Sequence, residues 1–230
     1  MKDGENKLNK QNKKGNRYKE NTKKKVKTNK NLIPNIILIF FIILFVFSGF
    51  KIIMWFLNNR ENKKIAEEIS QAITINEENV EEKKKYKVDF QTLKEKNSDT
   101  VGFLKVNGTN IEYTVVKGTN NSYYLKHNFN KESNSAGWIF ADYKNKVDGT
   151  DKNLVIYGHN MRDDSMFGSL KNILNDDWHN EEENKYVTFI TENDNSIYEV
   201  FSVYQVADED YYITTDFKDN EFNDFIKLTI

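Results

Sequence analysis

Three histidines are the residues of this chain best suited to acid–base chemistry near neutral pH. His159 follows the apolar run Asn153 to Tyr157 and Gly158. A glycine at the end of a strand permits a tight turn that can project the next side chain into a cleft. His127 (LKHNF) and His179 (DDWHNEEEN) have polar neighbours, so we expect both to face solvent. The residues alone leave two interpretations of His159 open, a catalytic base or an ordinary residue at a strand end, because a base needs a partner.

The absence of cysteine limits the chemistry open to this chain. A disulfide framework, a thiolate metal site and a thiol nucleophile are excluded within the sequence as given. Ser165 and Ser169, in MRDDSMFGSLK, lack the G-x-S-x-G elbow and an evident oxyanion partner. The histidines are separated by 32 and 20 positions, which is not a zinc-ligand spacing, and Asp142 to Asp151 does not follow the D-x-[DN]-x-[DN]-G pattern of a calcium loop. We therefore expect neither a metal nor a cofactor.

Charge is distributed unevenly around one long apolar segment. Residues 1–30 carry twelve Lys and Arg against three Asp and Glu, or +9, which leaves −10 for the remainder of a chain whose total is −1. The segment 32–57 has no charged residue between Ile36 and Phe50, and it is long enough to cross about 30 Å of hydrocarbon as a helix. Its exit lacks a small-residue cleavage site, so we expect an uncleaved anchor, with tail 1–31 in the cytoplasm and the following residues outside the cell.

The basic tail allows two interpretations. A Lys-rich run can bind phosphates, so a nucleic-acid-binding arm is one of them. Directly beside an expected membrane span, the same charges set topology and contact anionic lipid. We favour the membrane interpretation, which gives a lipid partner and no nucleic acid.

After the expected span, residues 58–98 are rich in Glu and Lys. Apolar residues recur there at spacings of three, four and seven, which favours an amphipathic helical stalk broken near Thr74 to Asn76. These apolar residues are Ile65, Ile69, Ala72, Ile73 and Val80. A solvated spacer is the alternative for the first half of this segment.

From Asp99 onward, short apolar runs separated by Gly, Asn and Asp turns predict a mainly β domain over 99–230. Six strands are expected at Val101 to Val106, Ile111 to Lys117, Gly137 to Tyr143, Asn153 to Gly158, Tyr186 to Thr191 and Ser196 to Ala207, with a hairpin turn at Glu192 to Asn195. Helical stretches are expected at Ser122 to Phe129, Met166 to Leu174 and Glu221 to Ile230. The spacing favours a mostly antiparallel barrel or sandwich carrying short helices.

Several blocks of this domain resemble class B sortases. They are VGFLKVNGTNIEYTVVKG (101–118), YYLKHNF (123–129), GWIFADY (137–143) and NLVIYGHNMRDDSMFGSL (153–170). The resemblance covers roughly 99–230 in order, and YGHNM followed by MFGSL is its most specific part. The preceding anchor and stalk suit the same family.

The resemblance implies a sortase-type β-barrel and a membrane-anchored cysteine transpeptidase. Such enzymes cleave an NPxTN-type sorting signal of a surface protein after the Thr and join the new carboxyl end to an amine of cell-wall peptidoglycan. His159 aligns with the family's catalytic acid/base. Asn121 and Leu125 fall where the family lines its substrate groove, and Tyr212 and Ile213 do so more weakly. Ordinary packing is the alternative for these four residues.

Three departures from the family pattern stand out. Thr114 replaces a common Pro, and Trp138 replaces a small residue. The family's TLxTC strand, which carries the nucleophile, and the following Arg lie beyond the helix matched by EFNDFIKLTI, and the given sequence contains neither. We therefore expect the last two strands of the barrel to be missing, through a fragmentary record, a frameshift or an early stop. Such a chain would be inactive and poorly stable, because the sheet edges and core are left open.

Two rival interpretations of the function stay open. A non-catalytic, membrane-anchored module could bind sorting signals without turnover, or the gene product could be degenerate. An unrelated anchored extracellular domain is the other rival.

Overall fold

The computed structural model describes residues 32–75, 86–206, 211–218 and 220–229. The chain divides into two compact units, Met1–Phe50 and Lys51–Ile230. The predicted basic tail, residues 1–31, lies outside the described residues, as does the part of the predicted stalk from 76 to 85.

One long helix, α2 (Leu32–Ser70), begins in the first unit and ends in the second. Its most apolar stretch has a mean hydropathy of 2.9, and none of that stretch is buried inside the protein. By length and composition, this helix could cross a membrane. The break predicted near Thr74 comes earlier, since the helix ends at Ser70, whose hydroxyl donates to the carbonyl of Glu67.

The part of α2 in the second unit buries a single face. Ile65 and Ile69 are buried in the core, as their spacing predicts. Asn59 and Asn62 extend the same buried face toward the apolar segment. A short antiparallel pair follows the helix, formed by β1 (Ile73–Ile75) and β2 (Tyr86–Val88).

A short helix, α3 (Phe90–Lys96), leads from this pair into the main sheet. The Asp89 side chain caps its start by accepting a hydrogen bond from the backbone amide of Thr92 at 3.1 Å. Leu93 is completely buried, and Phe90 nearly so, which fixes the helix against the core.

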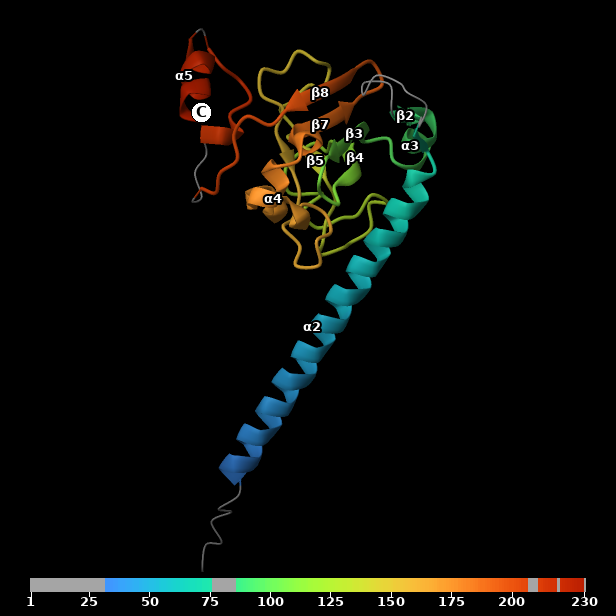
Figure 1. Ribbon diagram of the computed structural model, residues 1–230. Coiled ribbons are helices and arrows are strands. Elements are labelled where there is room, and N and C mark those ends of the chain that lie inside the picture. Colours follow the sequence, from blue (N-terminus) through green and yellow to red (C-terminus); the bar gives the residue numbers. More distant parts are fainter. Residues whose placement is uncertain (1–31, 76–85, 207–210, 219, 230) are drawn as a thin grey trace, which may run out of the picture. The chain divides into compact units, whose positions relative to one another are not determined.

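A curled six-stranded sheet forms the centre of the second unit (Figure 1), in the order β6-β5-β4-β3-β7-β8. Its strands are β3 (Thr100–Val106), β4 (Glu112–Val116), β5 (Phe140–Ala141), β6 (Ile156–Tyr157), β7 (Tyr186–Ile190) and β8 (Asn195–Glu199). Neighbouring strands are antiparallel except β4 and β5, which are parallel. The mainly β fold, its mostly antiparallel pairing and the six predicted strands are confirmed, and the curled sheet favours a barrel-type arrangement over a sandwich.

The three strands predicted at Gly137 to Tyr143, Asn153 to Gly158 and Ser196 to Ala207 are shorter than expected, because only two residues of β5 and two of β6 pair and β8 ends at Glu199. Residue 207 lies outside the described part of the chain. Beyond β8, the amide of Val200 donates to the carbonyl of Lys185 at 2.8 Å.

The short helices also differ from the predicted ones. Residues 168–174 form the 3-10 helix η2 (Gly168–Leu174), and α4 (Asp176–His179), η3 (Glu182–Lys185) and η4 (Tyr211–Ile213) were not expected. The last helix, α5 (Glu221–Thr229), occupies the predicted position.

The prediction of a helix at Ser122 to Phe129 is wrong, because this segment consists of bends and turns with an isolated bridge at His127. The side chain of Asn120 accepts from the backbone amides of Ser122 and Tyr123 at 2.9 Å, which starts a turn in place of a helix. The carbonyl of Tyr124 then accepts from the amide of Trp138, and that of Lys126 from the amide of Asn134. These long-range bonds use backbone groups that a helix would need for itself.

Two departures from the family pattern contact each other in the core. Trp138 is 1% exposed, and its indole nitrogen donates to the backbone carbonyl of Thr114 at 2.9 Å. Its ring packs edge-on against Tyr113 and lies 5.6 Å from the ring of Phe129. The large residue at 138 is therefore accommodated by a specific bond to β4.

This contact predicts the result of replacing Trp138. In the variant Trp138→Phe, a buried carbonyl loses its donor and part of the ring volume is left empty. We expect the free energy of unfolding to fall by about 1–3 kcal/mol. Urea denaturation followed by circular dichroism measures this loss. The exposed-helix variant Trp55→Phe is the control and should unfold like the parent, and equal midpoints for all three proteins would contradict the prediction.

Candidate functional site

His159 stands where β6 ends. A Cβ atom on Gly158 would lie 2.5 Å from the Cδ1 atom of Ile139 and 2.7 Å from the ring of Phe167, so only glycine permits this close packing. The carbonyl of His159 accepts from the amide of Phe167 at 3.0 Å. The imidazole is half-buried, and its Nε2 atom lies 2.8 Å from the backbone carbonyl oxygen of Leu125. Two predicted site residues, 34 positions apart, are thus brought together.

The contact with Leu125 determines the hydrogen arrangement of the neutral ring. A carbonyl oxygen only accepts hydrogen bonds, so Nε2 of His159 carries the hydrogen. The lone pair of the neutral imidazole is then on Nδ1, which can take up a proton. A histidine held in one tautomer by a backbone carbonyl has the chemistry of a general base, and of a general acid once protonated.

The carbonyl of Leu125 is itself held by a close backbone approach. Gly137 has a positive φ of 59°, and a Cβ atom there would lie 2.4 Å from the carbonyl oxygen of Tyr124 and 3.0 Å from that of Leu125. Only glycine fits both the conformation and the space. The next residue, Trp138, donates its amide to the carbonyl of Tyr124 at 2.9 Å. The turn that presents the Leu125 carbonyl therefore rests on the segment leading into β5.

Asn121 does not contact His159 through any of its observed bonds. Its amide nitrogen donates to Oδ2 of the buried Asp142 at 2.7 Å, and its side-chain oxygen accepts from the amide of Tyr143 at 3.0 Å. The hydroxyl of Tyr157 donates to the same Asp142 oxygen at 2.9 Å. Asn121 is thereby linked through one carboxylate to β6, two residues before His159.

Burial is the main cause that raises the pKa of Tyr157, and the hydrogen bond to Asp142 and the negative charge of that carboxylate raise it further. Ionisation would remove the proton that Tyr157 donates. The hydroxyl therefore stays a donor throughout the physiological range, and it keeps β6 tied to Asp142.

Tyr212 and Ile213 lie on η4 and are half-buried. The side chain of Asn153 donates to the carbonyl of Tyr212 at 3.1 Å and to that of Thr214 at 2.9 Å, so η4 is attached to the segment that leads to His159. Tyr212 also lines a groove of about 720 Å³, hereafter the seam groove. Its other lining residues come from the β6 side, from β7 and β8, and from α5, and they include Leu154, Ile156, Val187, Phe189, Tyr198, Phe201, Phe222 and Phe225.

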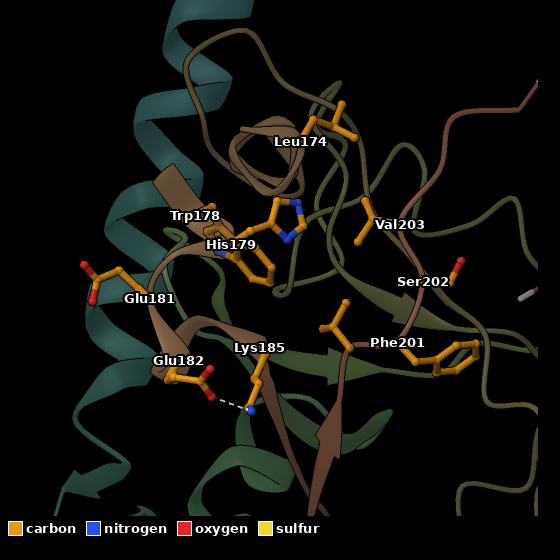
Figure 2. Close-up of a pocket in the computed structure, with 10 residues that line it drawn as sticks. Leu174, Trp178, His179, Glu181, Glu182, Lys185, Phe201, Ser202 and Val203 are labelled. Carbon is orange, nitrogen blue, oxygen red and sulfur yellow. Dashed lines mark hydrogen bonds and ion pairs between the residues drawn. The ribbon is translucent and has the colours of Figure 1, made fainter. Parts of the chain in front are cut away.

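A second hollow of about 400 Å³ lies beside His179 (Figure 2). Figure 2 shows the side chains of His179 and Lys185 on one side of it and those of Phe201 and Val203 on the other. Lys185 pairs there with Glu182 at 2.5 Å. None of the predicted site residues lines this hollow. His179 is exposed as predicted, whereas His127 is half-buried and stacks on the ring of Tyr123 at 4.0 Å.

The described residues contain no group of three or more His, Cys, Asp or Glu side chains placed to hold a metal ion. The arrangement around His159 itself has the elements of proton transfer: an oriented imidazole, a backbone acceptor and a buried carboxylate that bonds to β6.

Asp142 and Gly137 are site-supporting residues that the sequence interpretation missed. Both lie in the block GWIFADY, which was predicted to be a strand and resembles a sortase block, but in which neither residue was given a role in the site. A carboxylate that directly follows the apolar residues Ile139, Phe140 and Ala141 was the available signal, because a buried acid needs partners. The Leu125 carbonyl left no signal, since every residue has one.

Comparisons with known proteins agree with this geometry. Residues 104–229 match the family described as the sortase domain. Sortase B of Listeria monocytogenes is 35% identical over 187 residues, which cover 80% of this chain and 74% of the relative. A solved structure of sortase B from Clostridium perfringens is 42% identical with a TM-score of 0.57, covering 61% of this chain and 77% of that chain. Another, of sortase B from Bacillus anthracis, is 34% identical with a TM-score of 0.64, covering 76% of this chain and 80% of that chain.

The chain therefore belongs to the sortase family. Its relatives are class B sortases, which confirms the predicted class and the sortase-type fold. The chain spans about three quarters of the length of the curated relatives it matches. The family implies transpeptidation by a cysteine, and these 230 residues contain none.

The Tyr157 contact generates a pH prediction. Because the pKa of Tyr157 is raised in the folded protein, its stabilising contribution is complete below the ordinary tyrosine pKa of about 10 and is lost as the pH rises further. In the variant Tyr157→Phe, the free energy of unfolding at pH 7 should fall by about 1 kcal/mol. This is a small value for a hydrogen bond to a carboxylate, because the site is only half-buried and solvent screens the charge. The gap in unfolding free energy between parent and variant should narrow above pH 10.

Urea titrations at pH 7, 9, 10.5 and 11.5 measure this gap. Tyr198→Phe is a matched control, because Tyr198 is 52% exposed and should show no such gap at any pH. A gap for Tyr157→Phe that stays constant or widens above pH 10 would contradict the assigned pKa direction.

Proposed function

We propose that this chain provides the histidine side of a class B sortase active site, with His159 as the acid/base of transpeptidation. The observation that carries the proposal is the 2.8 Å contact between Nε2 of His159 and the Leu125 carbonyl, in a chain that belongs to the sortase family. The proposed substrate is a surface protein with an NPxTN-type sorting signal, and the proposed acceptor is an amine of cell-wall peptidoglycan.

The proposed reaction has two steps. A thiolate attacks the carbonyl carbon of the signal's Thr, the C–N bond to the next residue breaks, and protonated His159 gives its proton to the leaving amine. The incoming amine then attacks the thioester, His159 takes its proton, and the C–S bond breaks to release the thiolate. Because Nε2 donates to the Leu125 carbonyl, the lone pair of the neutral ring is on Nδ1. This nitrogen can accept the proton in one step and give it up in the other.

The thiol of this reaction is not among these 230 residues. We propose that the chain alone neither cleaves nor joins peptides. Its nearby serines, Ser165 and Ser169, lack the G-x-S-x-G elbow, and an unactivated hydroxyl is a poor substitute for a thiolate. The cysteine strand must be joined to these residues before turnover occurs.

Substrate binding is proposed for the rim on which His159 stands. Leu125 is 36% exposed and its carbonyl contacts the imidazole, so its side chain is available to an extended peptide beside the acid/base. Both polar groups of Asn121 are engaged with Asp142 and Tyr143, which supports a role in shaping the rim. Tyr212 is proposed to contribute through the seam groove, with Ile213 beside it on η4.

Anchoring in the cell membrane by the segment 32–57 is part of the proposal. The exposed, apolar first part of α2 supports a single span. The excess of Lys and Arg in residues 1–30 supports a cytoplasmic N-terminus and an extracellular catalytic domain. Membrane lipid is then a permanent partner of the anchor helix, and the proposed acceptor amine belongs to the cell wall outside the membrane.

A non-catalytic module that binds sorting signals is the second candidate. The observation favouring it is the combination of a groove of about 720 Å³ with a chain that has no cysteine. Saturable binding of an NPxTN-type peptide to the unmodified chain, together with no release of the leaving fragment by the chimera described below, would support this candidate.

A chimera tests the proposed reaction. A segment carrying the family's TLxTC motif and following Arg, taken from the Listeria monocytogenes relative, is fused after residue 230. We expect the chimera to release the leaving fragment from a fluorescence-quenched NPxTN-type peptide, and the unmodified chain to release none. His159→Ala in the chimera should lower the rate by about 10²–10⁴-fold, the usual value of general acid–base catalysis.

The matched control is His179→Ala in the chimera, because His179 is exposed and outside the proposed site. It should retain the parent rate. Release by the unmodified chain would contradict the proposed need for an added thiol. A folded chimera that is inactive, or equally active without the imidazole of His159, would contradict the proposed function.

A further inference from the structure

Two segments hold His159 in its orientation, and α2 is hydrogen-bonded to both. The first segment is the loop 159–168, which carries the histidine into η2. The second is the turn around Leu125, whose carbonyl contacts the imidazole. The bonds come from residues 58 to 63 of the helix, among which Asn59 and Asn62 are buried.

The loop that carries His159 is held through Asp163. The side-chain nitrogen of Asn59 donates to Oδ2 of Asp163 at 3.1 Å, and the amine of Lys63 lies 3.7 Å from the same oxygen. The other carboxylate oxygen accepts from the hydroxyl of Ser165 at 2.6 Å. One acidic side chain, four residues after His159, thus joins the helix to the loop.

The turn that contacts the imidazole is held through Asn62. Its side-chain nitrogen donates to the carbonyl of Gly137 at 2.9 Å, and its oxygen accepts from the side chain of Asn134 at 2.9 Å. Gly137 is the residue that lies against the Leu125 carbonyl, and the amide of Asn134 donates to the carbonyl of Lys126 at 2.8 Å. Gly137 and Asn134, the two hydrogen-bond partners of Asn62, therefore both support the turn whose carbonyl contacts the imidazole.

Packing alone does not require asparagine at these positions. Asn59 is 4% exposed and Asn62 is 1% exposed, and burying an amide costs free energy where its hydrogen bonds are not made. This cost applies to the side-chain oxygen of Asn59, which is buried without a hydrogen-bond partner among the described residues. On the same face, Ile65 and Ile69 achieve burial with apolar side chains. The amides contribute what the isoleucines cannot, which is directional bonds to Asp163 and Gly137.

We infer that Asn59 and Asn62 are positioning residues for His159, so that the helix leaving the expected membrane segment fixes the orientation of the acid/base. The catalytic meaning of this inference rests on the proposed function of His159. The structural claim does not, because it concerns only the ring and its contacts. Its test therefore needs neither a thiol nor a peptide.

The experiment is NMR of the full chain in detergent micelles, labelled in the histidine rings. The chain has only three histidines, so the ring signals can be assigned with His127→Gln and His179→Gln. At pH 8, above the ordinary histidine pKa, we expect Asn59→Ala and Asn62→Ala to move the Cε1–H and Nε2 signals of His159 toward those of the exposed His179. The His179 signals should stay in place.

Ile65→Ala is the matched control for general loosening. Ile65 lies on the same helix face and is equally buried, but its apolar side chain makes no hydrogen bond to the loop or the turn. It should lower the thermal midpoint and leave the His159 signals unchanged. If Ile65→Ala shifts His159 as the asparagine variants do, or if those variants leave it unshifted, the inference is overturned.

Asp163 allows the same contact to be broken from the other side. Its side chain is partly exposed, so Asp163→Ala should fold even where a buried asparagine cannot be replaced. We expect Asp163→Ala to shift His159 like Asn59→Ala. Asp163→Asn keeps one side-chain oxygen, which can accept from Asn59, while its new amide group faces the hydroxyl of Ser165, which can accept as well as donate. This variant should restore the parent signals. Identical His159 signals in the parent and Asp163→Ala would reject the contribution of Asn59.

Discussion

The contact between the imidazole of His159 and the carbonyl of Leu125 depends on a backbone approach too close for any side chain. Gly137 must adopt a positive φ and lie against the peptide of Tyr124 and Leu125, and Gly158 must pack against Ile139. Because a side chain at either position would clash with these neighbours, the two glycines allow the turn, β5 and β6 to pack closely. The tautomer of His159 follows from that arrangement, and so does its capacity to transfer protons.

A buried carboxylate reinforces the same arrangement from behind the sheet. Asp142 accepts from Asn121, Tyr157 and the amide of Lys144, so one side chain joins the turn region, β6 and the loop after β5. Such a network is stable only when its polar atoms find partners, and the Asp142 oxygens do. The residue that the family resemblance assigned to the substrate groove, Asn121, is thus also a structural member of the site.

The sequence predicted side-chain patterns well and long-range backbone contacts poorly. Short apolar runs between Gly, Asn and Asp turns located the six strands of the main sheet, and the spacing of Ile65 and Ile69 located the buried face of α2. The turn at 122–129 looked helical because its partners, Trp138 and Asn134, are distant in the chain and donate from the backbone. The position of His159 after Gly158 made it a candidate, and only the family resemblance assigned it the acid/base role. Its contact with Leu125 was not predictable, because it involves a carbonyl that every residue shares. Asn59 and Asn62 looked like part of a polar stalk, since burial of an amide depends on where its partners lie.

The bonds from α2 also bear on where a fragment without the apolar segment can begin. The composition changes at Asp99, and a fragment starting there would retain all six strands of the main sheet and His159 itself. It would lack the amides of Asn59 and Asn62, and the side chain of Asn134 would lose the helix to which it donates. A fragment starting at Asn58 omits the apolar segment and retains every bond between α2 and the site loops. The boundary relevant to expression and crystallisation is therefore the end of the apolar run at Leu57, some forty residues before the β-rich sequence begins.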